Sequence, residues 1–163
     1  EELDHLSAEA REQAEALKKE AAGQEEPYSP VDFYADYHIH YNQGTLLSFS
    51  IDTTTTMASG YDQRYFFNLD LETGQELTLT EVIGQDKLEA ADQQIRAQIE
   101  QRLAEDPSSF FDFSEEGGYS GLKADQKFYI NENRQVVVVF DEYEIAPGSS
   151  GTPEFILNLP LLK

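Results

Sequence analysis

One stretch, residues 135–148, constrains this chain more than any other part of its 163 residues. Its first half, residues 136–140, is an unbroken run of four Val and one Phe. Because this run has the length of a strand and does not alternate apolar with polar residues, we expect a central strand covered on both faces. The chain then becomes acidic and aromatic at residues 141–145, and Ala-Pro-Gly-Ser-Ser-Gly at 146–151 breaks the strand. A buried strand should therefore lead into a displayed loop, where binding residues are common.

Hydrophobic periodicity predicts the elements around this strand. Apolar side chains at steps of three and four indicate helices over residues 3–21 and 86–104. Turn residues such as Gly74 separate the strand patterns and favour short antiparallel hairpins. We expect an α+β fold in which an antiparallel sheet centres on residues 136–140 and both helices pack on it. The expected strands are 31–41, 46–56, 61–71, 76–80, 127–130, 135–141 and 154–159.

The length of the chain is that of one domain with a sizeable core. We expect residues 1–163 to form a single α+β domain, with residues 1–30 as an N-terminal helix and linker and residues 31–163 as the main body. The loop at residues 108–124 is too aromatic to lack a role, and the simpler interpretation is that it covers one open end of the core. Its aromatic side chains are Phe110, Phe111, Phe113 and Tyr119.

The charge of the chain is extreme, with 32 acidic and 11 basic side chains and a formal net charge of −21. Nucleic acids and anionic membrane surfaces bind to clustered Lys and Arg, so this field should repel both. It should attract a basic protein, a polycation or a metal cation. The alternative interpretation is that the charge serves solubility alone.

Two further features bear on location. No run approaches the ~20 apolar residues of a membrane-spanning helix, so we expect no direct membrane insertion of this fragment. The absence of Cys is compatible with an extracytoplasmic bacterial domain that folds without disulfides. Because the chain begins at Glu1 without Met, we expect a fragment or a mature form, with any membrane anchor upstream.

The motifs of catalysis and metal binding are weak. His38 and His40 share one strand face and make half of a metal site, but the chain has no Cys and only one other His. Two polar residues on a solvent face are the simpler interpretation. The chain lacks the spacing of a nucleophile elbow, a phosphate-binding loop and a dinucleotide fingerprint. We therefore expect no metal, no cofactor and no enzymatic activity.

Three segments together resemble a known family. They are residues 66–79, residues 127–130 and residues 138–148 with Gly151 and Phe155 after them. They resemble the extracytoplasmic C-terminal domain of the RsiV-type anti-sigma factors, a bacterial cell-envelope domain of largely unknown function. The order and spacing of elements extend the resemblance to about residues 34–160. One departure is Ala58-Ser59-Gly60, where the family often has an Ala-His-Gly-like turn.

The resemblance implies a non-catalytic binding or sensor domain outside the bacterial membrane, either anchored or secreted. In the member after which the family is named, binding of lysozyme licenses the proteolysis that frees a sigma factor, so the resemblance points to a basic protein such as lysozyme as the partner. The alternative is an accessory domain of a cell-wall enzyme such as a peptidoglycan deacetylase. A hydrolase in its own right is a third hypothesis, which a buried Ser–His or carboxylate pair in a deep pocket would support.

We expect a partner to bind at two loops, residues 57–61 and 146–151. Small residues there let a partner approach the backbone, and Tyr is a frequent hot-spot residue. The alternatives are that the glycines serve only turn geometry, or that the loops lie at opposite ends of the sheet. The predicted binding residues are Ser59, Gly60, Tyr61, Tyr143, Glu144, Pro147, Gly148 and Ser149.

Overall fold

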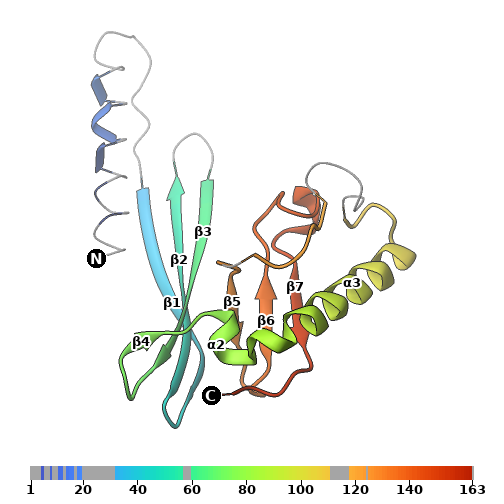
Figure 1. The fold of residues 1–163 in the computed structure, drawn as a ribbon. Helices are drawn as coiled ribbons and strands as arrows, with labels where there is room; N and C mark the ends of the chain where they lie inside the picture. The colour runs from blue at the N-terminus through green and yellow to red at the C-terminus, as the bar shows by residue number, and fades with distance from the viewer. Residues whose placement is uncertain are drawn as a thin grey trace. The chain divides into compact units, whose positions relative to one another are not determined.

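A computed structural model describes residues 32–56, 60–110, 118–123 and 125–162, together with isolated positions between 5 and 19. The fold is α+β, as predicted, and the described part of residues 32–162 contains a four-stranded sheet, a three-stranded sheet and one long helix (Figure 1). The four-stranded sheet has the order β1-β2-β3-β4 and the three-stranded sheet has the order β5-β6-β7. The elements are β1 (Asp32–Gln43), β2 (Leu46–Thr56), β3 (Gly60–Asp70), β4 (Gln75–Glu76), α2 (Leu79–Ile83), η1 (Gln85–Lys87), α3 (Leu88–Glu105), β5 (Phe128–Ile130), β6 (Val136–Val139), η2 (Gly148–Ser150) and β7 (Glu154–Leu157).

The chain divides into two compact units. Unit 1 consists of residues 1–38 and 51–65, and unit 2 consists of residues 39–50 and 66–163. In unit 1, Arg64 Nε donates to Asp52 Oδ1 at 2.7 Å across the paired strands β2 and β3. The single domain expected from the sequence stays a prediction. All sites described below lie in unit 2 unless stated otherwise.

The valine run forms the centre of the three-stranded sheet. β6 pairs antiparallel with β5 on one side and β7 on the other, and all four of its residues are buried. Val138 faces Phe128 on one neighbour and Phe155 on the other. The prediction of a central strand with both faces covered is therefore confirmed. The physical reason is that β-branched side chains on both faces favour burial between two layers.

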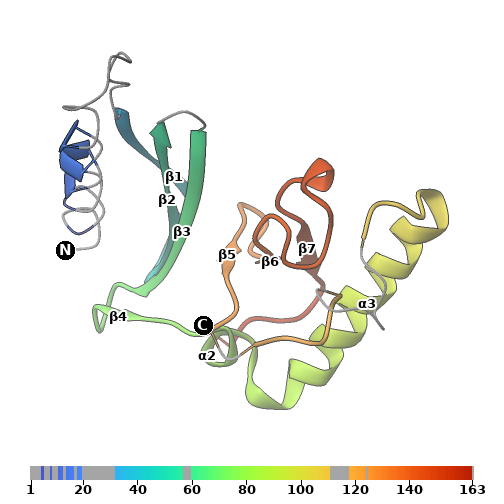
Figure 2. The same cartoon turned by 90° about the horizontal axis from the view of Figure 1, so that it is seen from above.

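Helix α3 covers one face of this sheet. Its buried residues Ala91, Ile95 and Ile99 recur at helical spacing and belong to the same core as Val138 and Phe155. Figures 1 and 2 both show α3 running alongside β7. The predicted bounds, 86–104, differ from the observed ones by at most two residues. Within the described residues, no helix is both long and apolar enough to cross a membrane.

Only part of the first predicted helix lies within the described residues. The described positions between 5 and 19 are helical. Most of the apolar stripe that should face a sheet lies outside the described residues, including Leu3, Leu6 and Leu17. Its packing on a sheet therefore stays a prediction.

The predicted strand at residues 76–80 is wrong. β4 ends at Glu76, and Leu79 begins helix α2. Thr78 is the N-cap of this helix, and a capping box joins it to Glu81: the Thr78 N–H donates to Glu81 Oε2 at 2.8 Å while Thr78 Oγ1 accepts from the Glu81 N–H. Two reciprocal bonds at the helix start outweigh the strand propensity of the alternating Leu and Thr residues.

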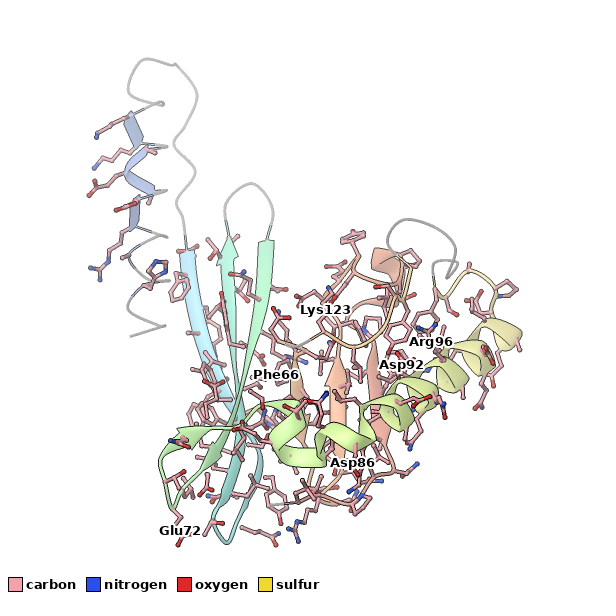
Figure 3. The ribbon with its side chains drawn as sticks, in the orientation of Figure 1. Phe66, Glu72, Asp86, Asp92, Arg96 and Lys123 are labelled. Carbon is pink, nitrogen blue, oxygen red and sulfur yellow. The ribbon has the colours of Figure 1, made fainter. Side chains whose placement is uncertain are left out.

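The aromatic loop closes the core, as predicted for the residues that are described. Tyr119 is buried and meets the Phe140 ring edge-on, with centroids 5.6 Å apart. Its hydroxyl donates to Asp92 Oδ1 at 2.7 Å, and Arg96 lies over its ring. Figure 3 shows Asp92 and Arg96 on α3. Burial and the bond to Asp92 raise the pKa of Tyr119 well above its usual range, so the phenol keeps its proton and pins the loop to α3. Phe111 and Phe113 lie outside the described residues.

Side chains form hydrogen bonds with the backbone groups of β5 that point away from β6. The Asn68 amide donates to the Phe128 carbonyl at 2.8 Å, and the Ile130 N–H donates to Ser48 Oγ at 2.9 Å. The Ser48 hydroxyl in turn donates to Asn68 Oδ1 at 2.7 Å. Ser48 and Asn68 are both buried. The edge of β5 is therefore closed by a buried polar pair rather than by another strand.

Side chains of α3 satisfy the opposite edge of the same sheet, on β7. They form one row along the helix, at intervals of four residues. The helix that packs beside this edge therefore satisfies its backbone hydrogen-bonding groups. The three bonds are Arg102 Nη2 to the Glu154 carbonyl at 2.8 Å, Gln98 Nε2 to the Ile156 carbonyl at 3.0 Å, and the Asn158 N–H to Gln94 Oε1 at 2.8 Å.

Candidate binding loop

The loop after β6 is held at both ends by the core. The Phe140 N–H donates to the Pro153 carbonyl at 3.0 Å, and Ile145 and Ala146 are buried in the middle of the loop. Between these anchors the Asp141 N–H donates to Glu144 Oε2 at 2.9 Å. The loop is therefore a fixed turn that projects from a rigid sheet, which is the arrangement predicted for residues 141–151.

Tyr143 stands out from this turn. It has a φ of 66°, in the left-handed region that non-glycine residues seldom adopt, and its side chain is 66% exposed. Its ring lies directly against Gly148, because a Cβ added to Gly148 would meet the Tyr143 Oη at 2.3 Å and Cζ at 2.4 Å. Gly148 therefore serves a close approach rather than turn geometry alone, and it seats an exposed aromatic ring in one position.

The acidic residues of the loop are partly neutralised by lysines. Lys127 Nζ lies 2.7 Å from both carboxylate oxygens of Asp141, and Lys123 Nζ lies 2.5 Å from Glu144 Oε1. The bond to Glu144 raises the pKa of Lys123. Both ion pairs are at the surface, where such pairs contribute little to stability. The loop thus presents less negative charge than its sequence indicates, and Glu142 is exposed at its tip.

The remaining predicted residues of this loop surround the short helix η2. Pro147 precedes η2 and is half-buried, while Ser149 is exposed. Ser150 lies in the predicted loop but is not among the predicted binding residues. Its hydroxyl donates to the Ser109 carbonyl at 2.9 Å and ties the loop to the segment after α3. The structure therefore brings together Tyr143, Pro147, Gly148 and Ser149, with Glu144 paired to Lys123.

The other predicted loop belongs to unit 1. Ser59 lies outside the described residues, Gly60 is the first residue of β3, and Tyr61 lies in β3. Whether residues 57–61 and 146–151 form one surface stays a prediction.

A serine–histidine contact does occur, as the hydrolase hypothesis requires. His40 Nε2 lies 3.1 Å from Ser50 Oγ. The His40 ring stacks on Tyr129 with centroids 4.1 Å apart, and Tyr129 in turn stacks on Phe66. Ser50 is 1% exposed, so its hydroxyl cannot reach a substrate. The solvent-face interpretation holds for His38, which is exposed, but not for His40, whose ring is part of an aromatic stack that the sequence did not predict.

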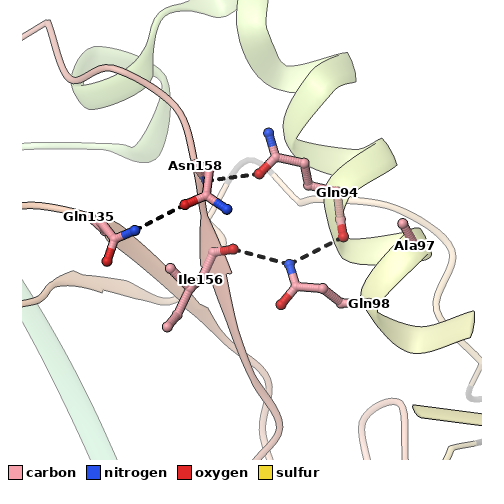
Figure 4. A pocket seen from close by; sticks show the side chains of 6 residues that line it. All are labelled: Gln94, Ala97, Gln98, Gln135, Ile156 and Asn158. Atoms are coloured by element: carbon pink, nitrogen blue, oxygen red, sulfur yellow. Dashed lines mark hydrogen bonds between the residues drawn. The ribbon is translucent and has the colours of Figure 1, made fainter. Parts of the chain in front are cut away.

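A second feature that the sequence did not predict is a polar groove beside β7 (Figure 4). Its volume is about 520 Å³. None of the six side chains that line it is charged, although the chain as a whole carries a net charge of −21. The spacing of Gln94, Gln98 and Arg102 on one helix face was the available signal. The lining residues are Gln94, Ala97, Gln98, Gln135, Ile156 and Asn158.

Comparison with solved structures supports the fold. The chain is similar to a DUF3298 family member from Bacteroides fragilis, with a TM-score of 0.65 and 20% identity, covering 95% of this chain and 62% of that one. It is also similar to a DUF3298 family protein from Pseudomonas aeruginosa, with a TM-score of 0.60 and 19% identity, covering 88% of this chain and 63% of that one.

Sequence comparison identifies the relatives. The anti-sigma-V factor RsiV of Bacillus subtilis is 32% identical over 130 residues, which cover 78% of this chain. The chain spans 46% of the length of RsiV. Residues 79–159 match the family described as protein of unknown function DUF3298, and this segment contains β5, β6, β7 and the candidate binding loop. The resemblance seen in the sequence is therefore confirmed: the chain carries a DUF3298 domain and is related to the anti-sigma factor RsiV.

Proposed function

We propose that this chain is a non-catalytic, extracytoplasmic binding domain of an anti-sigma-factor-like protein, and that its partner is a basic protein such as lysozyme. The relationship to an anti-sigma factor supports a regulatory protein rather than an enzyme. The proposal includes an anchor or secretion signal in a part of the full-length protein beyond this sequence. It places the chain on the outer side of a bacterial membrane.

The single observation that carries the proposal is the seating of Tyr143 on Gly148. An exposed aromatic ring that is already ordered loses little conformational freedom when a partner covers it. Tyr is also enriched among the residues that dominate binding energies, because it offers a large apolar face and a hydroxyl. The loop around it is fixed to the sheet at Phe140, Ile145 and Ala146, so the surface is preorganised.

The charge of the chain supports a basic partner. A net charge of −21 attracts a cationic protein over a distance and raises its association rate. At the loop itself, Asp141 and Glu144 are paired with lysines, so Glu142 is the acidic residue placed to meet a cation there. We therefore propose that the net charge attracts the partner over a distance and that Tyr143 makes the direct contact with it.

The proposed contact residues are those expected from the sequence. Tyr143, Glu144, Pro147, Gly148 and Ser149 form the part that lies in unit 2. Ser59, Gly60 and Tyr61 are the proposed part from unit 1.

Titration of the domain with a basic lysozyme by calorimetry, at low and at physiological ionic strength, tests the proposal. We expect binding that weakens with salt, since charge drives the encounter. Tyr143→Ala should weaken binding by about a hundredfold, the size of a hot-spot residue. Ser59→Arg should weaken it if the loop of unit 1 takes part.

Tyr34→Ala is the matched control, because Tyr34 is also an exposed tyrosine, 62% accessible, but lies on β1 in unit 1. It should leave the affinity unchanged. Undetectable binding at low salt would remove lysozyme as the partner. Equal affinities of the Tyr143→Ala and Tyr34→Ala variants would move the contact away from this loop.

A further inference from the structure

The groove beside β7 arises from a match between a helix and a strand. Residues four apart on a helix are separated by about 6.0 Å along its axis. Alternate residues of a strand, whose backbone groups point to the same edge, are separated by about 6.8 Å. These repeats are close enough for one row of α3 side chains to follow the edge of β7 step by step. The pairs are Gln94 with Asn158, Gln98 with Ile156, and Arg102 with Glu154.

The two glutamines therefore act as a substitute for a neighbouring strand. A side-chain amide contains the same donor and acceptor groups as a backbone peptide unit. Gln98 donates to the carbonyls of Gln94 and Ile156, and Gln94 accepts from the Asn158 N–H. These partners fix which end of each amide is nitrogen and which is oxygen, because a carbonyl only accepts and an N–H only donates.

Each fixed amide has one end left over. Among the described residues, Gln94 Nε2 and Gln98 Oε1 have no hydrogen-bond partner in the protein. Gln94 thus offers a donor and Gln98 an acceptor, about one helical turn apart. Figure 4 shows the two side chains projecting from α3 toward β7, with Ile156 and Ala97 beside them. Ile156 is 44% exposed and adds an apolar surface to the groove.

We propose that this groove binds an extended, uncharged polypeptide segment, whose backbone carbonyl accepts from Gln94 and whose backbone N–H donates to Gln98. A peptide backbone offers one acceptor and one donor at alternate residues along one edge, which matches the spacing of the two glutamines. The uncharged lining favours a segment without Asp, Glu, Lys or Arg at the contact. The site shares no residue with the candidate binding loop, and the inference does not rest on the proposed function.

An acetylated amino sugar also carries an amide, so an N-acetylated glycan is the competing ligand. Sugar-binding grooves usually contain an aromatic side chain on which a ring can stack. None of the six residues that line this groove is aromatic. The chemistry of the groove therefore favours the peptide.

The substitution Gln94→Glu isolates the ligand-binding end of one amide. The carboxylate of Glu still accepts from the Asn158 N–H, but its other oxygen can no longer donate to a ligand. Gln101→Glu is the charge-matched control, because Gln101 is exposed on the same helix and does not line the groove. Ala97→Tyr is a second variant that fills the groove from an exposed helix position.

The probe is a synthetic, blocked hexapeptide of alternating Thr and Val, followed by nuclear magnetic resonance of the side-chain amides of the protein. We expect its addition to shift the Gln94 and Gln98 signals. Gln94→Glu and Ala97→Tyr should each weaken binding about tenfold or more, while Gln101→Glu should leave it unchanged. A hexapeptide with methylated backbone nitrogens should also bind more weakly, since it lacks the N–H that Gln98 accepts.

Three results would overturn the inference. The first is no shift of the Gln94 and Gln98 signals at millimolar peptide. The second is equal affinity of the Gln94→Glu and Gln101→Glu variants. The third is binding of an oligomer of N-acetylglucosamine at these signals without binding of the peptide, which would assign the groove to a glycan.

Discussion

The two edges of the three-stranded sheet solve the same problem in different surroundings. At each edge, outward-pointing backbone groups are bonded by side chains instead of by another strand. On β5 the bonding side chains, Ser48 and Asn68, are buried and bonded to each other. On β7 they are half-exposed side chains of α3, and two of them, Gln94 and Gln98, border an open groove. The β5 edge is closed to a partner, and the β7 edge is accessible to one.

This difference shows that hydrogen-bond geometry alone does not determine what an edge can do. The bond lengths overlap, at 2.8 and 2.9 Å on β5 and 2.8 to 3.0 Å on β7. What differs is access to water. A bond that water can replace contributes little net stability, whereas removing a buried one leaves an unsatisfied polar group. We therefore expect the loss of a hydrogen bond at the β5 edge to lower the stability of the fold more than the loss of one at the β7 edge.

Hydrogen exchange should show the largest contrast between the edges. The Ile130 N–H is bonded to buried Ser48 and should exchange only when the domain unfolds. The Asn158 N–H is bonded to the half-exposed side chain of Gln94 and should exchange through local opening. We expect the Ile130 amide to be protected on the order of 10³-fold more than the Asn158 amide. Similar protection at both amides would contradict the comparison.

Substitution of the buried edge should have the largest effect on stability. Asn68→Ala removes the donor to the Phe128 carbonyl and the acceptor for Ser48. Two buried polar groups then lose a partner, and we expect the free energy of unfolding to fall by about 3 kcal/mol. Urea denaturation measures this change. Asn158→Ala is the control, because Asn158 is exposed and its side chain bonds only to the half-exposed Gln135, and it should cost less than about 0.5 kcal/mol.

Much of the fold could be predicted because local pattern and burial agree. The run at 136–140 gave the central strand, and the spacing of Ala91, Ile95 and Ile99 gave helix α3. The strand at 76–80 failed because a capping box at Thr78 overrode an alternating pattern. That signal was present in the sequence as Thr followed three residues later by Glu.

The sites were harder to predict because they depend on long-range contacts. The loop at 146–151 was predicted from its composition, but the seating of Tyr143 on Gly148 follows from the path of the backbone between them. The amide row on α3 is visible in the sequence only as Gln, Gln and Arg at intervals of four. The function of this row becomes clear only because β7, which is more than 50 residues away in the chain, lies alongside α3.

Arg102 tests the part of the exposed edge that also packs against the core. Its guanidinium donates to the Glu154 carbonyl and lies over the rings of Phe155 at 4.7 Å and Phe110 at 5.8 Å. Arg102→Ala removes the bond and the stacking together, and we expect a loss of about 2 kcal/mol in the free energy of unfolding. Arg102→Lys keeps the charge but not the planar stack, so it should recover less than half of this loss.

Gln98 should show the smallest effect, and it is the most direct test of the comparison. Gln98→Ala removes two hydrogen bonds, one to Ile156 and one within the helix. Water can reach the freed Ile156 carbonyl through the groove, so we expect a loss of less than about 1 kcal/mol. Gln101→Ala is the reference, because it makes the same change in helix propensity at an exposed position of α3. The loss of stability for Gln98→Ala is measured relative to that for Gln101→Ala. A difference as large as the loss for Asn68→Ala would mean that the β7 edge contributes as much to stability as the β5 edge, which would contradict the comparison.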